Sequence, residues 1–213
     1  MSVGEKYPDG NLLVVGVRVA GGAVNDEEIM KKYQIIYADP PWSYNDKMVG
    51  HQGAEGEYRT QDINWIKNLP IQKICDKDCV LFLWVVNPLL QEGMETLKAW
   101  GFDYVTLVFC WIKETPLLRL QVKNLGRWTM GGVELVLLGR KGHPKRIKNN
   151  VVQTVFDIRT SHSKKPMEVR RRIVDLMGDL PRIELFARKK TEGWDCLGNE
   201  ISGKDIKEEL AGI

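Results

Sequence analysis

The tetrapeptide Asp39-Pro40-Pro41-Trp42 combines groups that could act on an amino nitrogen. The carboxylate of Asp39 and the backbone carbonyl of Pro40 are hydrogen-bond acceptors. Because Pro40 and Pro41 fix φ and donate no N–H, the Pro40 carbonyl is held rigidly. Two such acceptors could take both N–H bonds of a weakly nucleophilic amino group, such as the 6-amino group of adenine. The nitrogen lone pair would then point at an incoming methyl group.

Trp42 adds a flat aromatic face on which a flipped-out base could stack. No strong base is required, since a sulfonium methyl donor already carries an excellent leaving group; alignment and electrostatics supply the acceleration. The alternative is a simple turn, because Asp-Pro and Pro-Pro are common turn signals. The position of the tetrapeptide directly after a predicted buried strand favours the catalytic interpretation.

Short apolar runs alternate with helical patterns along the rest of the chain. Strands are predicted at 34–38, 80–86, 104–112, 133–138, 151–158 and 182–187, and helices at 26–32, 88–100 and 166–177. This alternation predicts an α/β sandwich with a mostly parallel sheet, in which ligands bind beyond the carboxyl ends of the strands. Two long glycine-containing loops, 43–60 and 113–132, are either functional or ordinary surface loops.

The composition predicts one globular domain over residues 1–213, with 1–30 as an extension of unassigned role. Of the 213 residues, 43% are apolar and 28% charged. No apolar run approaches the roughly 20 residues that a membrane-spanning helix needs. The four cysteines lack the spacing of zinc ligands, so no metal is expected and reduced thiols in a cytoplasmic protein are the simplest interpretation. The glycine patterns of dinucleotide-binding and P-loop proteins are absent.

Basic residues are clustered, although the net charge is only +3. The run 140–148 holds five Lys or Arg in nine residues. Arg127, Lys145 and Arg146 are therefore candidates to contact the phosphates of a nucleic acid, and a solvated charged face is the alternative. Tyr58, in the first long loop, could hold the target base or pack in the core.

The segment 35–42, Ile-Ile-Tyr-Ala-Asp-Pro-Pro-Trp, resembles motif IV of the DPPW-type (MTA) amino-methyltransferases. That family includes the catalytic subunit of the mRNA adenosine methyltransferase and its bacterial, phage and ciliate DNA-modifying relatives. Further stretches match in the same order over about residues 33 to 203: 57–60, 80–85, 101–102, 111–113, 126–128, 134, 139–144, 163–166, 182–188, 193–194 and 197–200. The resemblance implies a Rossmann-like three-layer sandwich with permuted β-class motif order, and S-adenosyl-L-methionine as cofactor.

The resemblance also implies roles for residues in the second half of the chain. Lys165 would bind the cofactor carboxylate, and Arg188 its ribose. Asn199 and Glu200 would bind adenine and the ribose hydroxyls. Glu184 would point the same way as Phe186 along the last strand and support Arg188. The sequence departs from the family where Lys189-Lys190 follow Arg188 in place of a frequent histidine, and where Glu200 replaces glutamine.

Three functions follow from these patterns. The first is an N6-adenine methyltransferase acting on DNA in a prokaryotic or phage host, favoured because the chain is compact and shows no added RNA module. The second is the same reaction on RNA, for which a nuclear location stays open. The third is an inactive nucleic-acid-binding partner subunit, which would have no chemical need for Asp39 or Lys165. A homodimer or a related partner subunit is possible, and a small-molecule amine is the least favoured substrate.

Overall fold

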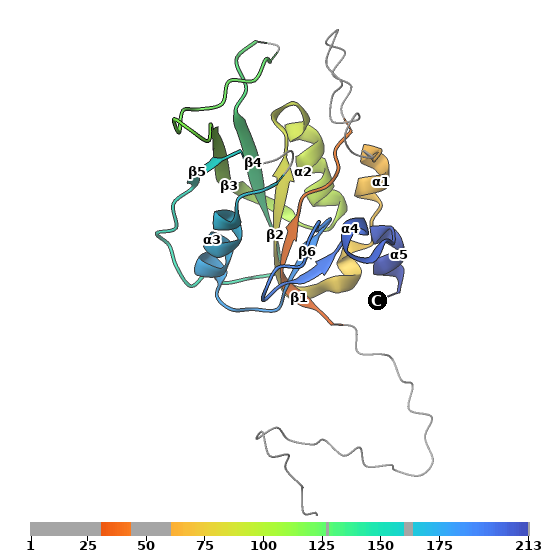
Figure 1. Ribbon diagram of the computed structural model, residues 1–213. Helices are drawn as coiled ribbons and strands as arrows, with labels where there is room; N and C mark the ends of the chain where they lie inside the picture. Colours follow the sequence, from red (N-terminus) through yellow and green to blue (C-terminus); the bar gives the residue numbers. More distant parts are fainter. Residues whose placement is uncertain (1–30, 44–60, 127, 160–163, 213) are drawn as a thin grey trace, which may run out of the picture. The chain divides into compact units, whose positions relative to one another are not determined.

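Strand β1 (Tyr33–Ala38) lies near the middle of the sheet in the computed structural model and leads directly into the tetrapeptide (Figure 1). The structure describes residues 31–43, 61–126, 128–159 and 164–212. Tyr58 and Arg127, both expected to contact substrate, therefore lie outside the described residues. The predicted N-terminal extension and most of the predicted helix 26–32 lie outside them too.

The remaining elements follow the order expected from the sequence, with several short additions. They are α1 (Ile63–Lys67), η2 (Ile71–Ile74), β2 (Cys75–Val85), η3 (Asn87–Leu89), α2 (Leu90–Ala99), β3 (Asp103–Glu114), β4 (Val133–Lys141), β5 (Thr154–Ile158), α3 (Met167–Met177), β6 (Arg182–Leu185), β7 (Asp195–Leu197), α4 (Asn199–Ser202) and α5 (Ile206–Ala211). The six predicted strands and the two later helices are confirmed within a few residues at most ends. The elements that the sequence did not predict are too short to show a clear period.

The seven strands form one sheet in the order β5-β3-β4-β2-β1-β6-β7. All neighbours are parallel except those of β4, which runs antiparallel to both β2 and β3. The expected mostly parallel α/β sheet is therefore confirmed. Ala38 is paired with Leu83 in β2 and with Leu185 in β6, so these three strands end at one edge of the sheet. This is the edge at which the sequence predicted a ligand site.

Helices cover both faces of the sheet, and alternate residues of the strands face the two layers (Figure 1). In β1, Ile36 and Ala38 join the core that includes residues of α1, α2 and α5. Ile35 and Tyr37 join the core beneath α3. Among the residues that the structure describes, no helix is long and apolar enough to cross a membrane.

Helix α3 packs on the sheet through one stripe of apolar side chains. Val169, Ile173 and Met177 recur every four residues and are all buried. Gly178 then ends the helix with a φ of 93°, in the left-handed region that favours glycine. The sequence predicted both the apolar period of this helix and its end at Gly178.

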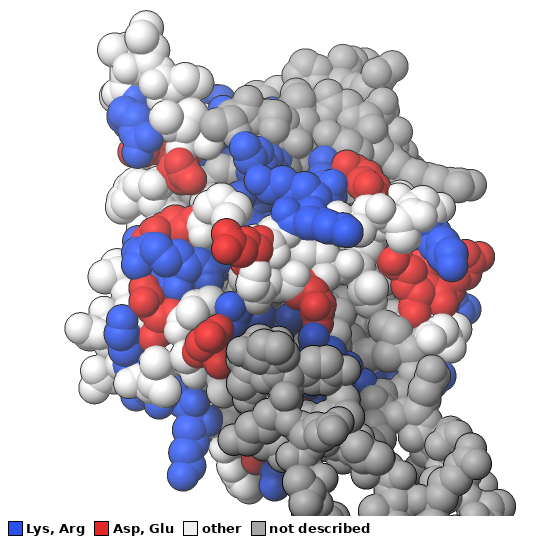
Figure 2. All heavy atoms as spheres, turned by 60° about the horizontal axis from the view of Figure 1, so that its bottom comes forward, with Lys and Arg blue, Asp and Glu red and all other residues white. Residues whose placement is uncertain are grey.

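The reversed direction of β4 decides where its two ends lie. Glu134, near its start, lies at the same edge as the tetrapeptide. Arg140, near its end, pairs with Val80 and with Asp103 at the start of β3, about 20 Å away along the strand. Lys145 and Arg146 follow at this opposite edge, so the structure does not bring them to Asp39. On the face that includes this edge, Lys and Arg alternate with Asp and Glu rather than forming one basic field (Figure 2).

Candidate active site

Hydrogen bonds on both sides fix the tetrapeptide at the end of β1. The backbone N–H of Trp42 donates to the Pro40 carbonyl at 2.8 Å, and that of Gln61 donates to the Pro41 carbonyl at 2.9 Å. The indole Nε1 of Trp42 donates to the Trp84 carbonyl at 2.9 Å, and the side chain is only 6% exposed. Trp42 thus anchors the loop in the core and presents little free ring surface. Its stacking against a base stays a prediction.

Four charged side chains of alternating sign meet at this edge. Lys165 Nζ lies 2.7 Å from Asp39 Oδ2 and 3.3 Å from Glu134 Oε2. Lys113 Nζ in turn lies 2.5 Å from Glu134 Oε1. The side chain of Lys165 is 8% exposed, and its Nζ lies 5.3 Å from the centre of the Trp84 ring. We name this set, Asp39–Lys165–Glu134–Lys113, the charge chain.

Burial and neighbouring charges shift the pKa values of Lys165, Glu134 and Asp39. Burial alone would lower the pKa of Lys165, but the charges of Asp39 and Glu134 and their hydrogen bonds outweigh burial and raise it. Burial would raise the pKa of Glu134, but Lys165 and Lys113 outweigh burial and lower it. For Asp39, burial dominates and raises the pKa, although Lys165 opposes it. Lys165 is therefore held in its charged form beside an aspartate that takes up a proton more readily than usual.

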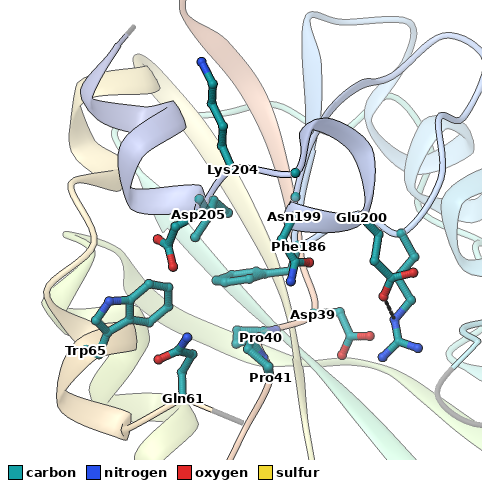
Figure 3. A pocket seen from close by; sticks show the side chains of 14 residues that line it. Asp39, Pro40, Pro41, Gln61, Trp65, Phe186, Asn199, Glu200, Lys204 and Asp205 are labelled. Atoms are coloured by element: carbon teal, nitrogen blue, oxygen red, sulfur yellow. Dashed lines mark ion pairs between the residues drawn. The ribbon is translucent and has the colours of Figure 1, made fainter. Parts of the chain in front are cut away.

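A cavity of about 290 Å³ opens on another side of Asp39 (Figure 3). It is lined by Asp39, Pro40, Pro41, Gln61, Trp65, Phe186, Arg188, Gly198, Asn199, Glu200, Gly203, Lys204, Asp205 and Ile206. The structure therefore brings Asp39, Arg188, Asn199 and Glu200 together, as their predicted roles require. Arg188 Nε lies 3.6 Å from Glu200 Oε1. Lys165 does not line this cavity, but it contacts Asp39, which does.

Glu184 was expected to point the same way as Phe186 and to support Arg188, and the shared direction was wrong. Strand β6 ends at Leu185, and Phe186 has a φ of 61°, which breaks the alternation of a strand. Phe186 packs with the core on the α1 and α5 side and lines the cavity. Glu184 faces α3 instead and accepts from Arg170 Nε at 2.8 Å. Glu184 is 5% exposed, so it is not placed to contact a ligand in the cavity.

Several residues at this edge were not predicted as functional. Lys113 and Glu134 complete the charge chain, and Trp65, Gln61 and Asp205 line the cavity. Glu134 could have been found if the direction of its strand had been known, since only an antiparallel β4 brings its start to the active edge. The sequence gives only a weak indication of Asp205, because an aspartate at this position is also explained by capping the short helix α5.

Comparison with known proteins identifies the family. The MT-A70 family model matches residues 33–200. The chain belongs to the MT-A70 family. Within the match lie the tetrapeptide, the charge chain and the residues from Arg188 to Glu200. This MT-A70 protein is an N6-adenine methyltransferase that uses S-adenosylmethionine.

Named relatives include bacterial and eukaryotic proteins. The chain is 35% identical over 196 residues to the type II methyltransferase M.MunI of Mycoplasma sp, covering 83% of this chain and 81% of that one. It is 32% identical over 184 residues to the human N(6)-adenosine-methyltransferase catalytic subunit METTL3, covering 84% of this chain and 30% of the human protein. A MT-A70-like protein of Medicago truncatula is 30% identical, with 28% of its length covered. The chain thus spans most of M.MunI but less than a third of these eukaryotic relatives.

The residues of the cavity fit the chemistry of this cofactor. The cofactor carries a positive sulfonium, ribose hydroxyls and a flat base. Asp39 and Glu200 supply carboxylates that attract positive charge and accept from hydroxyls. Phe186 and Trp65 supply aromatic faces, and Asn199 an amide with donors and acceptors. When bound, the cofactor supplies the activated methyl group.

Proposed function

We propose that this MT-A70 enzyme methylates the 6-amino group of adenine in DNA, with Asp39 and Pro40 binding that amino group. The observation that carries the proposal is the position of Asp39, between the cavity on one side and Lys165 on the other. A target nitrogen held at Asp39 can face the cavity without entering it. The similarity to M.MunI, a type II methyltransferase, supports DNA as the substrate.

Asp39 and Pro40 have the acceptors that this role requires. The Pro40 carbonyl uses one lone pair for the Trp42 N–H, which leaves the second for a substrate N–H. The Asp39 carboxylate accepts from Lys165 through Oδ2, which leaves Oδ1 for the other substrate N–H. The nitrogen then forms a bond to the methyl carbon as the bond from carbon to sulfur breaks. Asp39 is placed to take the proton that the nitrogen loses.

The other predicted roles are part of the same proposal. Arg188, Asn199 and Glu200 would bind the ribose and base of the cofactor. Lys165 has three N–H donors, and the two carboxylates of the charge chain engage two of them, so one remains for the cofactor carboxylate. Because the catalytic tetrapeptide follows β1 and the proposed cofactor residues follow β6, the motif order agrees with a permuted β-class enzyme.

We also infer how the target reaches the site. An adenine inside a duplex cannot reach Asp39, so it would be flipped out or taken from a single strand. Lys145 and Arg146 could contact phosphates only of a nucleic acid that extends to the opposite edge. A homodimer or a related partner subunit is supported by exposed apolar side chains in the β3–β4 loop, where Leu117 is 89% and Trp128 is 97% exposed. A DNA-modifying role in a prokaryotic or phage host would place the enzyme in the cytoplasm.

RNA is the second candidate substrate, because METTL3 and other relatives carry the name N(6)-adenosine-methyltransferase. The experiment that separates the candidates uses labelled S-adenosylmethionine with matched single- and double-stranded DNA and RNA oligonucleotides. We expect label in DNA, on the adenine 6-amino group, as identified after nucleoside digestion. Label mainly in RNA would favour the second candidate. Label in none of the four would contradict the proposed activity and favour an inactive partner subunit.

The pKa of Asp39 predicts how activity depends on pH. Asp39 must be ionised to accept an N–H, and its raised pKa means that it is protonated at a higher pH than usual. We expect kcat/KM to fall on the acid side with a midpoint above about 3.9, the ordinary pKa of aspartate. Lys165→Met should move this midpoint to higher pH, because the charge that favours ionised Asp39 is lost.

The neighbouring Lys164 provides the matched control, because its side chain is exposed. The pH profile of Lys164→Met should coincide with that of the wild type. If the acid-side midpoint of kcat/KM in Lys165→Met equals that of the wild type, Lys165 does not control the ionisation of Asp39.

A further inference from the structure

One end of the cavity contains a carboxylate, that of Asp205, which has no role in the reaction proposed above. This end is formed by Gln61, Trp65, Phe186 and Asp205, and we name it the aromatic end (Figure 3). Trp65 comes from α1, and Phe186 follows β6. The positive φ of Phe186 turns its ring away from α3 and into this cavity. The aromatic end therefore offers two flat faces beside polar groups.

Asp205 points its carboxylate into the aromatic end, whereas the neighbouring Lys204 points away from it (Figure 3). Oδ1 of Asp205 accepts from the backbone N–H of Lys207 at 2.8 Å and so caps α5. Oδ2 has no hydrogen-bond partner among the residues that the structure describes. An ionised carboxylate oxygen can only accept hydrogen bonds, so this end of the cavity favours a ligand with an N–H or O–H donor.

The position of the cavity decides which of the two adenines of the reaction fits here. Arg188 and Glu200 lie on the same cavity wall, next to Asp39, and are the groups suited to a ribose. Lys165 lies beyond Asp39, outside the cavity, so the cofactor carboxylate proposed to bind Lys165 would lie at the Asp39 side and the base at the far, aromatic end. A base attached to a ribose held at Arg188 and Glu200 would extend toward Trp65 and Asp205.

We propose that Asp205 selects the adenine of the cofactor by accepting a hydrogen bond from its 6-amino group, with the base against Phe186 and Trp65. This inference rests on the proposed use of the cavity for the cofactor. Adenine presents an amino donor at position 6, where hypoxanthine presents a carbonyl acceptor. A carboxylate binds the first and repels the second. Sites built around such a hydrogen bond discriminate strongly against an analogue that lacks it.

The test compares S-adenosylhomocysteine with S-inosylhomocysteine, in which a 6-oxo group replaces the 6-amino group and N1 carries a proton. Calorimetry on the full chain should give a Kd ratio of about 100 in favour of the adenosyl compound, as expected for one hydrogen bond to a charged group. Asp205→Asn should lower this ratio at least tenfold, because the asparagine amide can donate to the 6-oxo group. Asparagine also caps helices as well as aspartate, so α5 is expected to be retained.

Two further variants serve as controls. Glu208→Ala should leave the ratio unchanged, since the Glu208 side chain is exposed on α5 and does not line the cavity. Trp65→Leu should weaken both compounds by a similar factor, because stacking does not depend on the group at position 6. Thermal unfolding of each variant checks that the fold is kept.

An Asp205→Asn variant with the wild-type Kd ratio would overturn the inference, even if both affinities fell, because a purely structural role of Asp205 would affect the two compounds equally. A wild-type protein that binds neither compound would instead contradict the proposed use of the cavity. A wild-type protein that binds both compounds with similar affinity would overturn the role of Asp205 and leave the proposed use of the cavity standing.

Discussion

Replacing Asp39 by alanine is expected to lower the rate of methyl transfer by about 10³-fold or more, while binding of S-adenosylhomocysteine is largely retained. The variant loses one of the two acceptors proposed to align the substrate amino group. It also leaves Lys165, which is 8% exposed, with Glu134 as its remaining carboxylate partner. The cavity keeps Arg188, Asn199 and Glu200, so the cofactor contacts proposed for them survive. Single-turnover transfer of labelled methyl and calorimetric binding measure the two effects separately.

Asp39→Asn refines this test, because it keeps the size and one acceptor oxygen but removes the charge. We expect it to retain some activity above Asp39→Ala. Asp179→Ala is the matched control, since the Asp179 side chain is 87% exposed and pairs with Arg182 at the surface. Full activity of Asp39→Ala would refute the mechanism, and loss of cofactor binding in parallel with activity would instead assign Asp39 to the cofactor.

Replacing Glu184 by alanine is expected to lower the free energy of unfolding by about 3–5 kcal/mol. Glu184 and Arg170 form a two-point ion pair in which Arg170 Nε lies 2.8 Å from Glu184 Oε2. Both residues are buried, and the Arg170 guanidinium lies 5.0 Å from the centre of the Tyr37 ring. Removing the carboxylate leaves the buried cation without its charged partner. Urea or thermal unfolding of Glu184→Ala against the wild type measures the loss.

Two other variants give this stability prediction its controls. Arg171→Ala removes exposed ion pairs on the same helix and should cost less than about 1 kcal/mol. The double variant Arg170→Met with Glu184→Leu should recover most of the loss, because apolar side chains of similar size can replace a buried pair. If Glu184→Ala unfolded no more easily than Arg171→Ala, the pair would not be holding α3 on the sheet.

The strands and long helices could be predicted because their patterns are local. The apolar run at 80–85 has the length and composition of a buried strand, and the stripe Val169, Ile173 and Met177 has the period of a helix. The lack of such a period explains why α1, β7, α4 and α5 were missed. Their three to six residues depend on neighbours rather than on their own pattern, as with Ile206 and Leu210 of α5, which are buried in the shared core.

The sequence by itself determined the chemistry at the end of β1. Asp39, Pro40 and Pro41 carry their acceptors and their rigidity wherever they lie, and the apolar strand before them locates the edge of the sheet. Cofactor-binding roles for Arg188, Asn199 and Glu200 could be predicted because their order along the chain matches a family. Only the tertiary structure decided what surrounds these residues. The reversal of β4 brings Glu134 to Lys165 and carries Arg146 away, and the positive φ at Phe186 separates its ring from Glu184. Strand direction and a single left-handed residue leave no period in a sequence, because the packing of distant elements sets both.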